Sequence, residues 1–177
     1  MIRRGASRIL VFALVIVVLL APALAGASSK RTSEFRAIRH LRSTTWHWQN
    51  VMGVARTPTS HRALTVSSTK YRRWVMKLWR KRAVRVQRLA SSVPHRSQWL
   101  CIHRGEGSWT ANTGNGYYGG LQMDISFQRS YGGYLLRRKG TANHWSPAEQ
   151  MWVAERAYKS GRGFYPWPNT ARACGLL

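Results

Sequence analysis

Glu106 is the carboxylate in this sequence best placed for acid–base chemistry. It opens the segment EGSWTANTGNGYYGGLQMD, residues 106–124, which is rich in glycine, asparagine and aromatic residues. It is one of only five acidic residues in a chain with a formal net charge of +24. We expect it at the C-terminal end of a helix, where a negative charge opposes the helix dipole. An acid in an unfavourable position beside aromatic rings is typical of a proton donor.

The other four acidic residues have structural explanations. Asp124 precedes ISFQRSY and is expected to be a helix N-cap. Glu149 completes the capping box of residues 146–149, Ser-Pro-Ala-Glu. Glu155 lies four residues before Lys159, which is typical of a surface ion pair on a helix. Glu34 is expected to begin a basic helix, where the dipole favours a negative charge.

Neither a metal site, nor a cofactor motif, nor an activated nucleophile is predicted. His103 lies three residues before Glu106, on the same face of a helix, but no second pair of metal ligands follows. Ser108 lacks the strand–turn–helix context of a nucleophilic serine. The remaining histidines do not have the spacing of zinc ligands: His40, His47, His61, His95 and His144.

Local signals predict the elements that position Glu106. A short helix over residues 97–107 is expected to end near Gly105 or Gly107, so that Glu106 falls at its C-terminal end. Asn115-Gly116 predicts a hairpin turn, because both residue types tolerate positive φ. The helix that begins at the 146–149 capping box is expected to end at Gly161.

The region before this segment is strongly basic. Residues 30–96 contain 17 basic residues and one acid, Glu34. Helical spacing predicts two helices, one marked by Phe35, Ile38 and Leu41 and the other by Tyr71, Trp74, Val75, Leu78 and Trp79. Residues 55–69 are expected to form a loop, and residues 91–95, SSVPH, to end the second helix at a hinge. A basic amphipathic helix like the second one packs on a neighbouring element, lies on an anionic membrane or wall surface, or binds nucleic acid. The spacing of its residues does not distinguish between these three roles.

The first 25 residues have the pattern of a signal peptide. Three arginines precede an apolar run over residues 9–20, and Ala23-Leu24-Ala25 offers a cleavage site. The alternative is a membrane anchor, because the run has nearly the roughly 20 residues that spanning requires. Without these arginines, 26 basic residues stand against five acids, a net charge of +21, which predicts affinity for polyanions. Among polyanions, nucleic acid is the least favoured partner of an exported chain, so no specific nucleic-acid partner is expected.

The only two cysteines are Cys101 and Cys174. An even pair in an exported chain predicts a disulfide that closes a long loop, and two free buried thiols are the alternative.

The segment EGSWTANTGNGYYGGLQM, the following YGG and AEQMWVAERAYKSGRGFYPWP together resemble the resuscitation-promoting-factor or transglycosylase-like domain family. The resemblance covers residues 96–177. It implies a small lysozyme-like fold that cleaves the glycan strands of peptidoglycan, with Glu106 as the catalytic glutamate. It also implies that a set of residues lines the sugar cleft: Trp109, Asn112, Tyr117, Tyr118, Gln122 and Trp167.

The sequence departs from that family in three ways. Where the family has E-S-G-G-N-W, this chain has Glu106-Gly107-Ser108-Trp109, two residues shorter; an alignment without a gap places Arg104 at the catalytic position. The family's cysteines directly precede the glutamate and follow the Trp-Pro pair by two residues, whereas Cys101 and Cys174 each lie four residues further outward. Tyr117 stands where related animal-type lysozymes have a second acid, and Asp124 lies further along.

We therefore expect an α+β, mainly α fold: a small lysozyme-like domain with a short β-hairpin over 96–177, preceded by a signal peptide at 1–25 and a basic, partly helical region at 26–95. The expected function is a secreted peptidoglycan-cleaving enzyme of the cell envelope, a lytic transglycosylase or muramidase, monomeric and without a cofactor. Anionic wall polymers or a membrane surface are the partners expected for the basic region. Alternatives are a non-catalytic peptidoglycan-binding module with a cationic arm and a cationic membrane-active protein.

Overall fold

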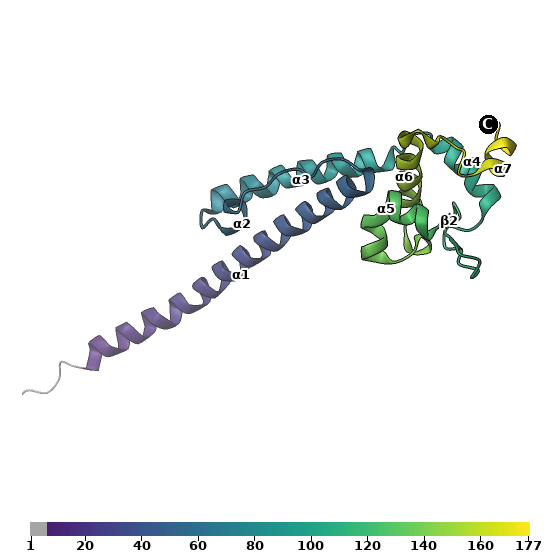
Figure 1. Ribbon diagram of the computed structural model, residues 1–177. Coiled ribbons are helices and arrows are strands. Elements are labelled where there is room, and N and C mark those ends of the chain that lie inside the picture. Colours follow the sequence, from purple (N-terminus) through teal and green to yellow (C-terminus); the bar gives the residue numbers. More distant parts are fainter. Residues whose placement is uncertain (1–6) are drawn as a thin grey trace, which may run out of the picture. The chain divides into compact units, whose positions relative to one another are not determined.

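The computed structural model describes the backbone of residues 7–177 and the side chains of residues 28–177 (Figure 1). The predicted signal peptide, residues 1–25, lies outside the described side chains and stays a prediction. Among the residues that were described in full, no helix combines the length and the apolar character needed to cross a membrane.

The described chain is mainly helical with one small antiparallel hairpin, which confirms the expected fold class. In chain order its elements are α1 (Ser7–Met52), α2 (Arg62–Thr65), α3 (Thr69–Ser91), α4 (Arg96–Glu106), β1 (Tyr117–Tyr118), β2 (Met123–Asp124), α5 (Ile125–Lys139), η1 (Ala142–His144), α6 (Pro147–Ala157), η2 (Tyr158–Arg162) and α7 (Pro168–Ala173).

The chain divides into two compact units. One contains residues 1–41 and 59–80, and the other contains residues 42–58 and 81–177. The second unit therefore includes the end of α1 and of α3 in addition to the 96–177 region. The predicted division at residue 95 stays a prediction.

In the first unit the expected second helix is present as α3, but the expectation for Glu34 is wrong. Glu34 does not begin a helix, because α1 is continuous from Ser7 to Met52. Its carboxylate is buried and accepts a 2.8 Å hydrogen bond from Arg72 Nε, which is also buried. The tertiary partner, 38 residues away in the chain, explains the position of this acid better than the helix dipole does.

In the second unit the local predictions for the helix starts are confirmed. Asp124 caps α5 by accepting a 2.7 Å hydrogen bond from Phe127 N. Ser146 and Glu149 form the complete capping box of α6. Gly161 leaves the helical conformation with φ +95°, but regular α-helix ends earlier, at Ala157, and a π-helical turn, η2, covers the residues between.

One apolar core lies among these helices. α5 packs against α6, and α4 packs against α7 (Figure 1). The largest side chains of this core include Trp99, Ile102, Leu121 and Leu135, all nearly inaccessible to solvent. Val51 from α1 and Val93 from the α3–α4 connection belong to the same core.

Candidate functional site

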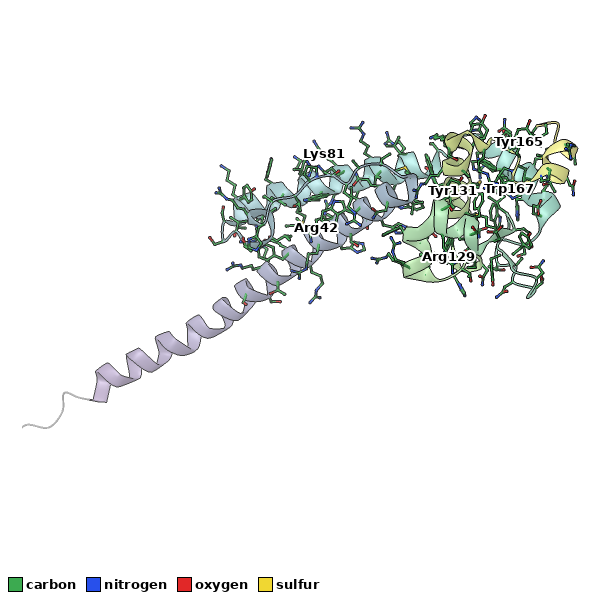
Figure 2. All side chains as sticks on the ribbon, in the orientation of Figure 1. Arg42, Lys81, Arg129, Tyr131, Tyr165 and Trp167 are labelled. Carbon is green, nitrogen blue, oxygen red and sulfur yellow. A yellow bond between two sulfur atoms is a disulfide. The ribbon has the colours of Figure 1, made fainter. Side chains whose placement is uncertain are left out.

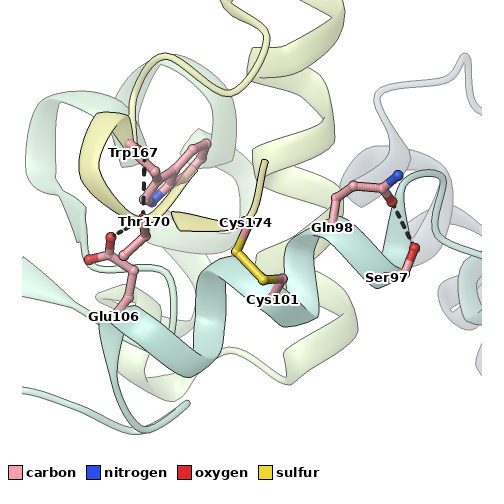
Figure 3. The surroundings of a disulfide bond; sticks show 7 residues. All are labelled: Ser97, Gln98, Cys101, Glu106, Trp167, Thr170 and Cys174. Carbon is pink, nitrogen blue, oxygen red and sulfur yellow. Dashed lines mark hydrogen bonds between the residues drawn. A yellow bond between two sulfur atoms is a disulfide. The ribbon is translucent and has the colours of Figure 1, made fainter. Parts of the chain in front are cut away.

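Glu106 is the last residue of α4, as predicted. Gly107 ends the helix with φ +138°, and its N–H donates to His103 O. The Glu106 side chain is half-buried, and its Oε1 accepts a 2.7 Å hydrogen bond from Thr170 Oγ1 of α7 (Figure 3). Within the described chain Oε2 has no hydrogen bond and the carboxylate forms no ion pair. One oxygen is thus held by the protein and the other is available to a ligand.

Gly105 and Thr170 occupy the two positions where the family resemblance places cysteines. A Cβ atom on Gly105 would lie 2.7 Å from Thr170 Cγ2, so only glycine fits there while α7 keeps this position. The Cys101–Cys174 disulfide is present about one helical turn away from this contact, with a Cα–Cα distance of 6.1 Å (Figure 3). The covalent link has moved outward, and Thr170 is left free to bind Glu106.

Trp109 is held by a histidine stacked on its ring. The ring centroids of His103 and Trp109 are 3.8 Å apart and their planes differ by 19°. The backbone of Gly120 crosses next to both rings: a Cβ there would lie 2.6 Å from His103 Nδ1 and 2.7 Å from Trp109 Cε3. His103 Nδ1 also lies 3.1 Å from Gly120 O. Trp109 therefore has a fixed place next to the hairpin.

The hairpin positions four further predicted site residues, Asn112, Tyr117, Tyr118 and Gln122. In its two strands Tyr117 pairs with Asp124 and Tyr118 with Met123, and Asn112 forms an isolated bridge to Tyr118. The chain reverses between the strands at residues 119–122, where Gln122 has φ +45°.

The prediction of a hairpin turn at Asn115-Gly116, based on their tolerance of positive φ, is wrong in two respects. These residues precede β1, in the bend between Asn112 and Tyr118, whereas the reversal between β1 and β2 lies at residues 119–122. Only Gly116 has positive φ, whereas Asn115 uses its side-chain oxygen to accept a 3.0 Å hydrogen bond from Tyr117 N. This side chain satisfies the turn locally, so the asparagine does not need the left-handed conformation.

A pocket of about 370 Å³ lies between the hairpin, α5 and the segment before α7. Three of the predicted site residues line it, namely Tyr117, Gln122 and Trp167. Trp167 is almost completely buried, and its Nε1 donates a 2.6 Å hydrogen bond to Leu121 O. The other lining residues are Met123, Asp124, Ser126, Phe127, Ser130, Arg162 and Pro166.

Glu106, Trp109, Asn112 and Tyr118 do not line this pocket. Glu106 is connected to it through Thr170, whose Oγ1 lies 2.7 Å from Glu106 Oε1 and 3.4 Å from Trp167 O. The structure thus places Glu106 and Trp109 at α4, places Asn112 and Tyr118 on the hairpin outside the pocket lining, and brings only Tyr117, Gln122 and Trp167 to the pocket.

Glu155 forms the predicted ion pair with Lys159, but its own carboxylate does not lie on the surface. Its side chain is completely buried, and Oε2 accepts 3.1 Å hydrogen bonds from His95 Nδ1 and Trp99 Nε1. Oε1 has no hydrogen-bond partner among the described residues, and Lys159 Nζ lies 3.8 Å from it. These hydrogen-bond partners come from residues 60 and 56 positions earlier in the chain, which the helical spacing to Lys159 does not reveal.

Glu149 has more partners than its capping box. Burial by itself raises the pKa of its carboxyl, but hydrogen bonds from His47, Lys139 and Ser146 N prevail and lower the pKa to about 2. His47 Nε2 lies 2.9 Å from Oε1, and Lys139 Nζ lies 2.7 Å from both oxygens. Glu149 is therefore a structural anion that joins α1, α5 and α6.

Comparison with known proteins finds a family that is similar to the part of the chain that contains the site. Residues 94–170 match the family described as Transglycosylase-like domain. This part of the chain is similar to transglycosylase-like domains and is called the transglycosylase-like domain here. The match begins just before α4 and extends to Thr170, so it includes Glu106 and the whole pocket lining.

Curated relatives of the transglycosylase-like domain are resuscitation-promoting factors. Rpf1 of Corynebacterium glutamicum is 38% identical over 89 residues, which are 49% of this chain and 44% of the relative. RpfE of Mycobacterium tuberculosis is 39% identical over 82 residues, 45% of this chain and 44% of the relative. Rpf of Micrococcus luteus is 37% identical over 70 residues, 40% of this chain and 29% of the relative. The chain spans less than half the length of each of these relatives.

Sequence reasoning missed two residues of the site, Thr170 and Arg162. Thr170 lies 64 positions from Glu106, and the signal for it was the outward shift of both cysteines, which vacates positions 105 and 170. Arg162 enters the pocket next to Trp167, and its placement between two glycines was the available signal.

Proposed function

We propose that the transglycosylase-like domain cleaves the glycan strand of peptidoglycan between N-acetylmuramic acid and N-acetylglucosamine, with Glu106 as general acid and base. The observation that carries this proposal is the placement of Glu106, which ends α4 with one oxygen held by Thr170 and the other without a protein partner. Thr170 in turn contacts Trp167, which lines the 370 Å³ pocket. The similarity to this family supports the same reaction class.

In the proposed mechanism, protonated Glu106 donates its proton to the glycosidic oxygen as the bond to the muramyl C1 breaks. The N-acetyl group of the same sugar stabilises the positive charge that develops at C1. Glu106, now ionised, accepts a proton from the muramyl 6-hydroxyl, whose oxygen bonds to C1 and gives a 1,6-anhydro end. If water donates the proton instead, hydrolysis results.

The other acidic residues favour a mechanism with one carboxyl group. A retaining glycosidase needs two carboxyl groups about 5 Å apart. Glu34, Glu149 and Glu155 are buried with structural partners, and Asp124 caps α5 through Oδ1. The transglycosylase route needs no second acid, so we propose the anhydro product as the main one.

The direct test is Glu106→Gln in the full chain, assayed for release of soluble fragments from purified peptidoglycan. We expect loss of release, and mass spectrometry of the wild-type products should show anhydro ends. Arg104→Gln is the matched control, because it makes a similar change two residues away on α4 at an exposed position. Unchanged release by Glu106→Gln, or loss in Arg104→Gln alone, would reject the assignment.

A second candidate function is a peptidoglycan-binding module that does not cleave. The observation that favours it is that Glu106 does not line the pocket, whereas Tyr117, Gln122 and Trp167 do. This candidate predicts that the wild-type chain sediments with insoluble peptidoglycan and releases no soluble product.

We also propose that the chain is exported by the 1–25 segment, acts as a monomer at the cell envelope and uses its basic region to bind anionic wall polymers or a membrane surface. In the first unit, α3 buries Val75 and Trp79 while Arg73, Lys77 and Arg80 are exposed. Trp74 is also 56% exposed on this helix. Sedimentation with anionic vesicles or with isolated wall polymers that weakens as salt rises supports this role; binding to neutral vesicles of equal strength rejects it.

A further inference from the structure

Arg162 reaches the pocket from an unusual turn. It is the last residue of the π-helical turn η2, between Gly161 at φ +95° and Gly163 at φ +52°. A Cβ on either glycine would meet no atom within 4 Å, so the backbone conformation, and not space, favours glycine there. The two glycines allow a sharp change of direction on both sides of this arginine.

The Arg162 guanidinium has no acidic partner in the described chain. None of the described ion pairs includes it. Its Cζ lies 6.0 Å from the centre of the Phe127 ring. A hydrogen bond with Ser160 lowers the pKa of Tyr131 (labelled in Figure 2), and burial opposes this shift. Arg162 also lowers this pKa through a hydrogen bond and its charge, so the guanidinium lies close to the Tyr131 hydroxyl. Its charge is therefore available to a ligand.

The pocket wall next to Arg162 offers further donors. Ser126 and Ser130 are four residues apart on α5, hence on one face of the helix, and both line the pocket. Neither hydroxyl forms a hydrogen bond within the described chain. Asp124 also lines the pocket, but it caps α5 and forms no ion pair with Arg162.

A guanidinium and two free hydroxyls facing one cavity are suited to a carboxylate. Arginine presents its N–H groups as a planar fork that matches the two oxygens of a carboxylate. Tyr117 also lines the pocket and, being 48% exposed, offers an aromatic surface to a sugar ring. The cavity thus combines a sugar-binding wall with an anion-binding corner.

We propose that Arg162, assisted by Ser126 and Ser130, binds a carboxylate carried by the substrate's muramic acid, either the lactyl carboxylate itself or one on the attached peptide. The proposal rests on the proposed function, since it specifies which group of the glycan this pocket recognises. It makes Arg162 a specificity-determining residue for acidic glycans over uncharged ones of the same ring chemistry. Because Arg162 is exposed, we expect an effect of about fivefold that decreases as salt rises.

The test measures binding of three soluble probes to the full chain carrying Glu106→Gln, with and without Arg162→Gln. The probes are an N-acetylglucosamine tetramer without carboxylates, a peptide-free glycan strand with lactyl carboxylates, and a peptide-bearing strand of the same length. Arg129→Gln is the matched control, since it removes one exposed positive charge from α5 outside the pocket lining (Figure 2).

We expect Arg162→Gln to weaken binding of at least one carboxylate probe about fivefold and to leave the tetramer unchanged. Weakening of the peptide-free strand assigns the lactyl carboxylate, and weakening of the peptide-bearing strand alone assigns the peptide. Equal affinities with and without the substitution, equal weakening of all three probes, an equal effect of Arg129→Gln, or no binding of either carboxylate probe would overturn the proposal. Failure of the proposed function appears separately, as wild-type chain that binds the strands but releases no product.

Discussion

The hydroxyl of Thr170 donates a 2.7 Å hydrogen bond to Oε1 of Glu106, while its methyl group lies against the bare backbone of Gly105. This contact brings the first turn of α7 to the last turn of α4. In the family pattern the same two positions carry cysteines, so a bridge there would leave no hydroxyl for the glutamate. Here the Cys101–Cys174 bond lies one turn outward and secures the two helices, and the vacated contact orients the carboxylate instead.

Thr170→Val is therefore expected to reduce kcat about tenfold with little change in KM, if Glu106 is the general acid. Valine has nearly the same shape and keeps the contact with Gly105, but it removes the hydrogen bond that fixes Oε1, and bonds to charged groups contribute about 1.5–3 kcal/mol. Thr170→Ser keeps the hydroxyl and should retain most of the activity. Glycan cleavage rates and thermal melting of both variants check this. Equal activity of the valine variant and the wild type, or equal loss in the serine variant, contradicts it.

Acid stability is expected to depend on Glu149. Its pKa is lowered in the folded state from 4.5 to about 2, so its contribution is present above pH 4.5 and is lost as the pH falls toward 2. At about 1.36 kcal/mol per pKa unit, this contribution is about 3 kcal/mol. Urea unfolding at pH 7 and at pH 3 should show the loss in the wild type. Glu149→Gln should be less stable at pH 7 and should change less between the two pH values; an unaltered pH dependence would argue against this assignment.

Local interactions account for what the sequence predicted correctly. The end of α4, the Asp124 cap and the capping box of α6 depend on hydrogen bonds between residues at most four apart. Glu155 shows the limit of such reasoning. Its spacing to Lys159 is the same on a surface and in a core, and its burial depends on His95 and Trp99, about 60 residues earlier.

In the candidate site, too, some features follow from local sequence patterns and others only from tertiary packing. Glu106, Tyr117, Gln122 and Trp167 were singled out by their types and by the family resemblance, whereas Thr170 and Arg162 were not. Which of the predicted residues share the pocket depends on how α5, the hairpin and the segment before α7 pack, and that packing leaves Trp109 on His103 outside the lining. Residue patterns selected candidates, and tertiary packing decided which of them face one cavity.

Gly120→Ala is expected to displace the stacked pair of His103 and Trp109. The added Cβ would lie 2.6–2.7 Å from both rings, and overpacking of this kind typically costs about 1–3 kcal/mol. Gly133→Ala is the matched control, because this glycine lies inside α5 and its added Cβ meets only Arg137 Nη1 at 3.4 Å. For Gly120→Ala, urea unfolding should show a lower free energy of unfolding and near-ultraviolet circular dichroism a weaker aromatic signal. Gly133→Ala should show neither change. Similar behaviour of the two variants would show that Trp109 moves aside without cost.

Loss of the disulfide is expected to lower the free energy of unfolding by about 2–5 kcal/mol, because the bond closes a loop with a sequence separation of 73 residues. The double variant C101S/C174S tests this without leaving free thiols, and reduction of the wild-type chain provides an independent comparison. The Thr170–Glu106 contact lies one turn away, so the cleavage rate at low temperature should also fall. If the double variant is as stable as the wild type, packing of α7 against α4 is sufficient to hold the two helices together without the disulfide.

The transglycosylase-like domain is expected to depend for its stability on residues that precede its family match at 94–170. Trp152 Nε1 donates a 2.8 Å hydrogen bond to Ala90 O, and Val51 and Val93 belong to its core. A fragment of residues 94–177 lacks these partners, and burial of each valine contributes about 1.5–3 kcal/mol. We therefore expect it to be at least 3 kcal/mol less stable than a fragment of residues 42–177, which retains them. Urea unfolding followed by tryptophan fluorescence compares the two, and equal midpoints would place the domain boundary at residue 94 instead.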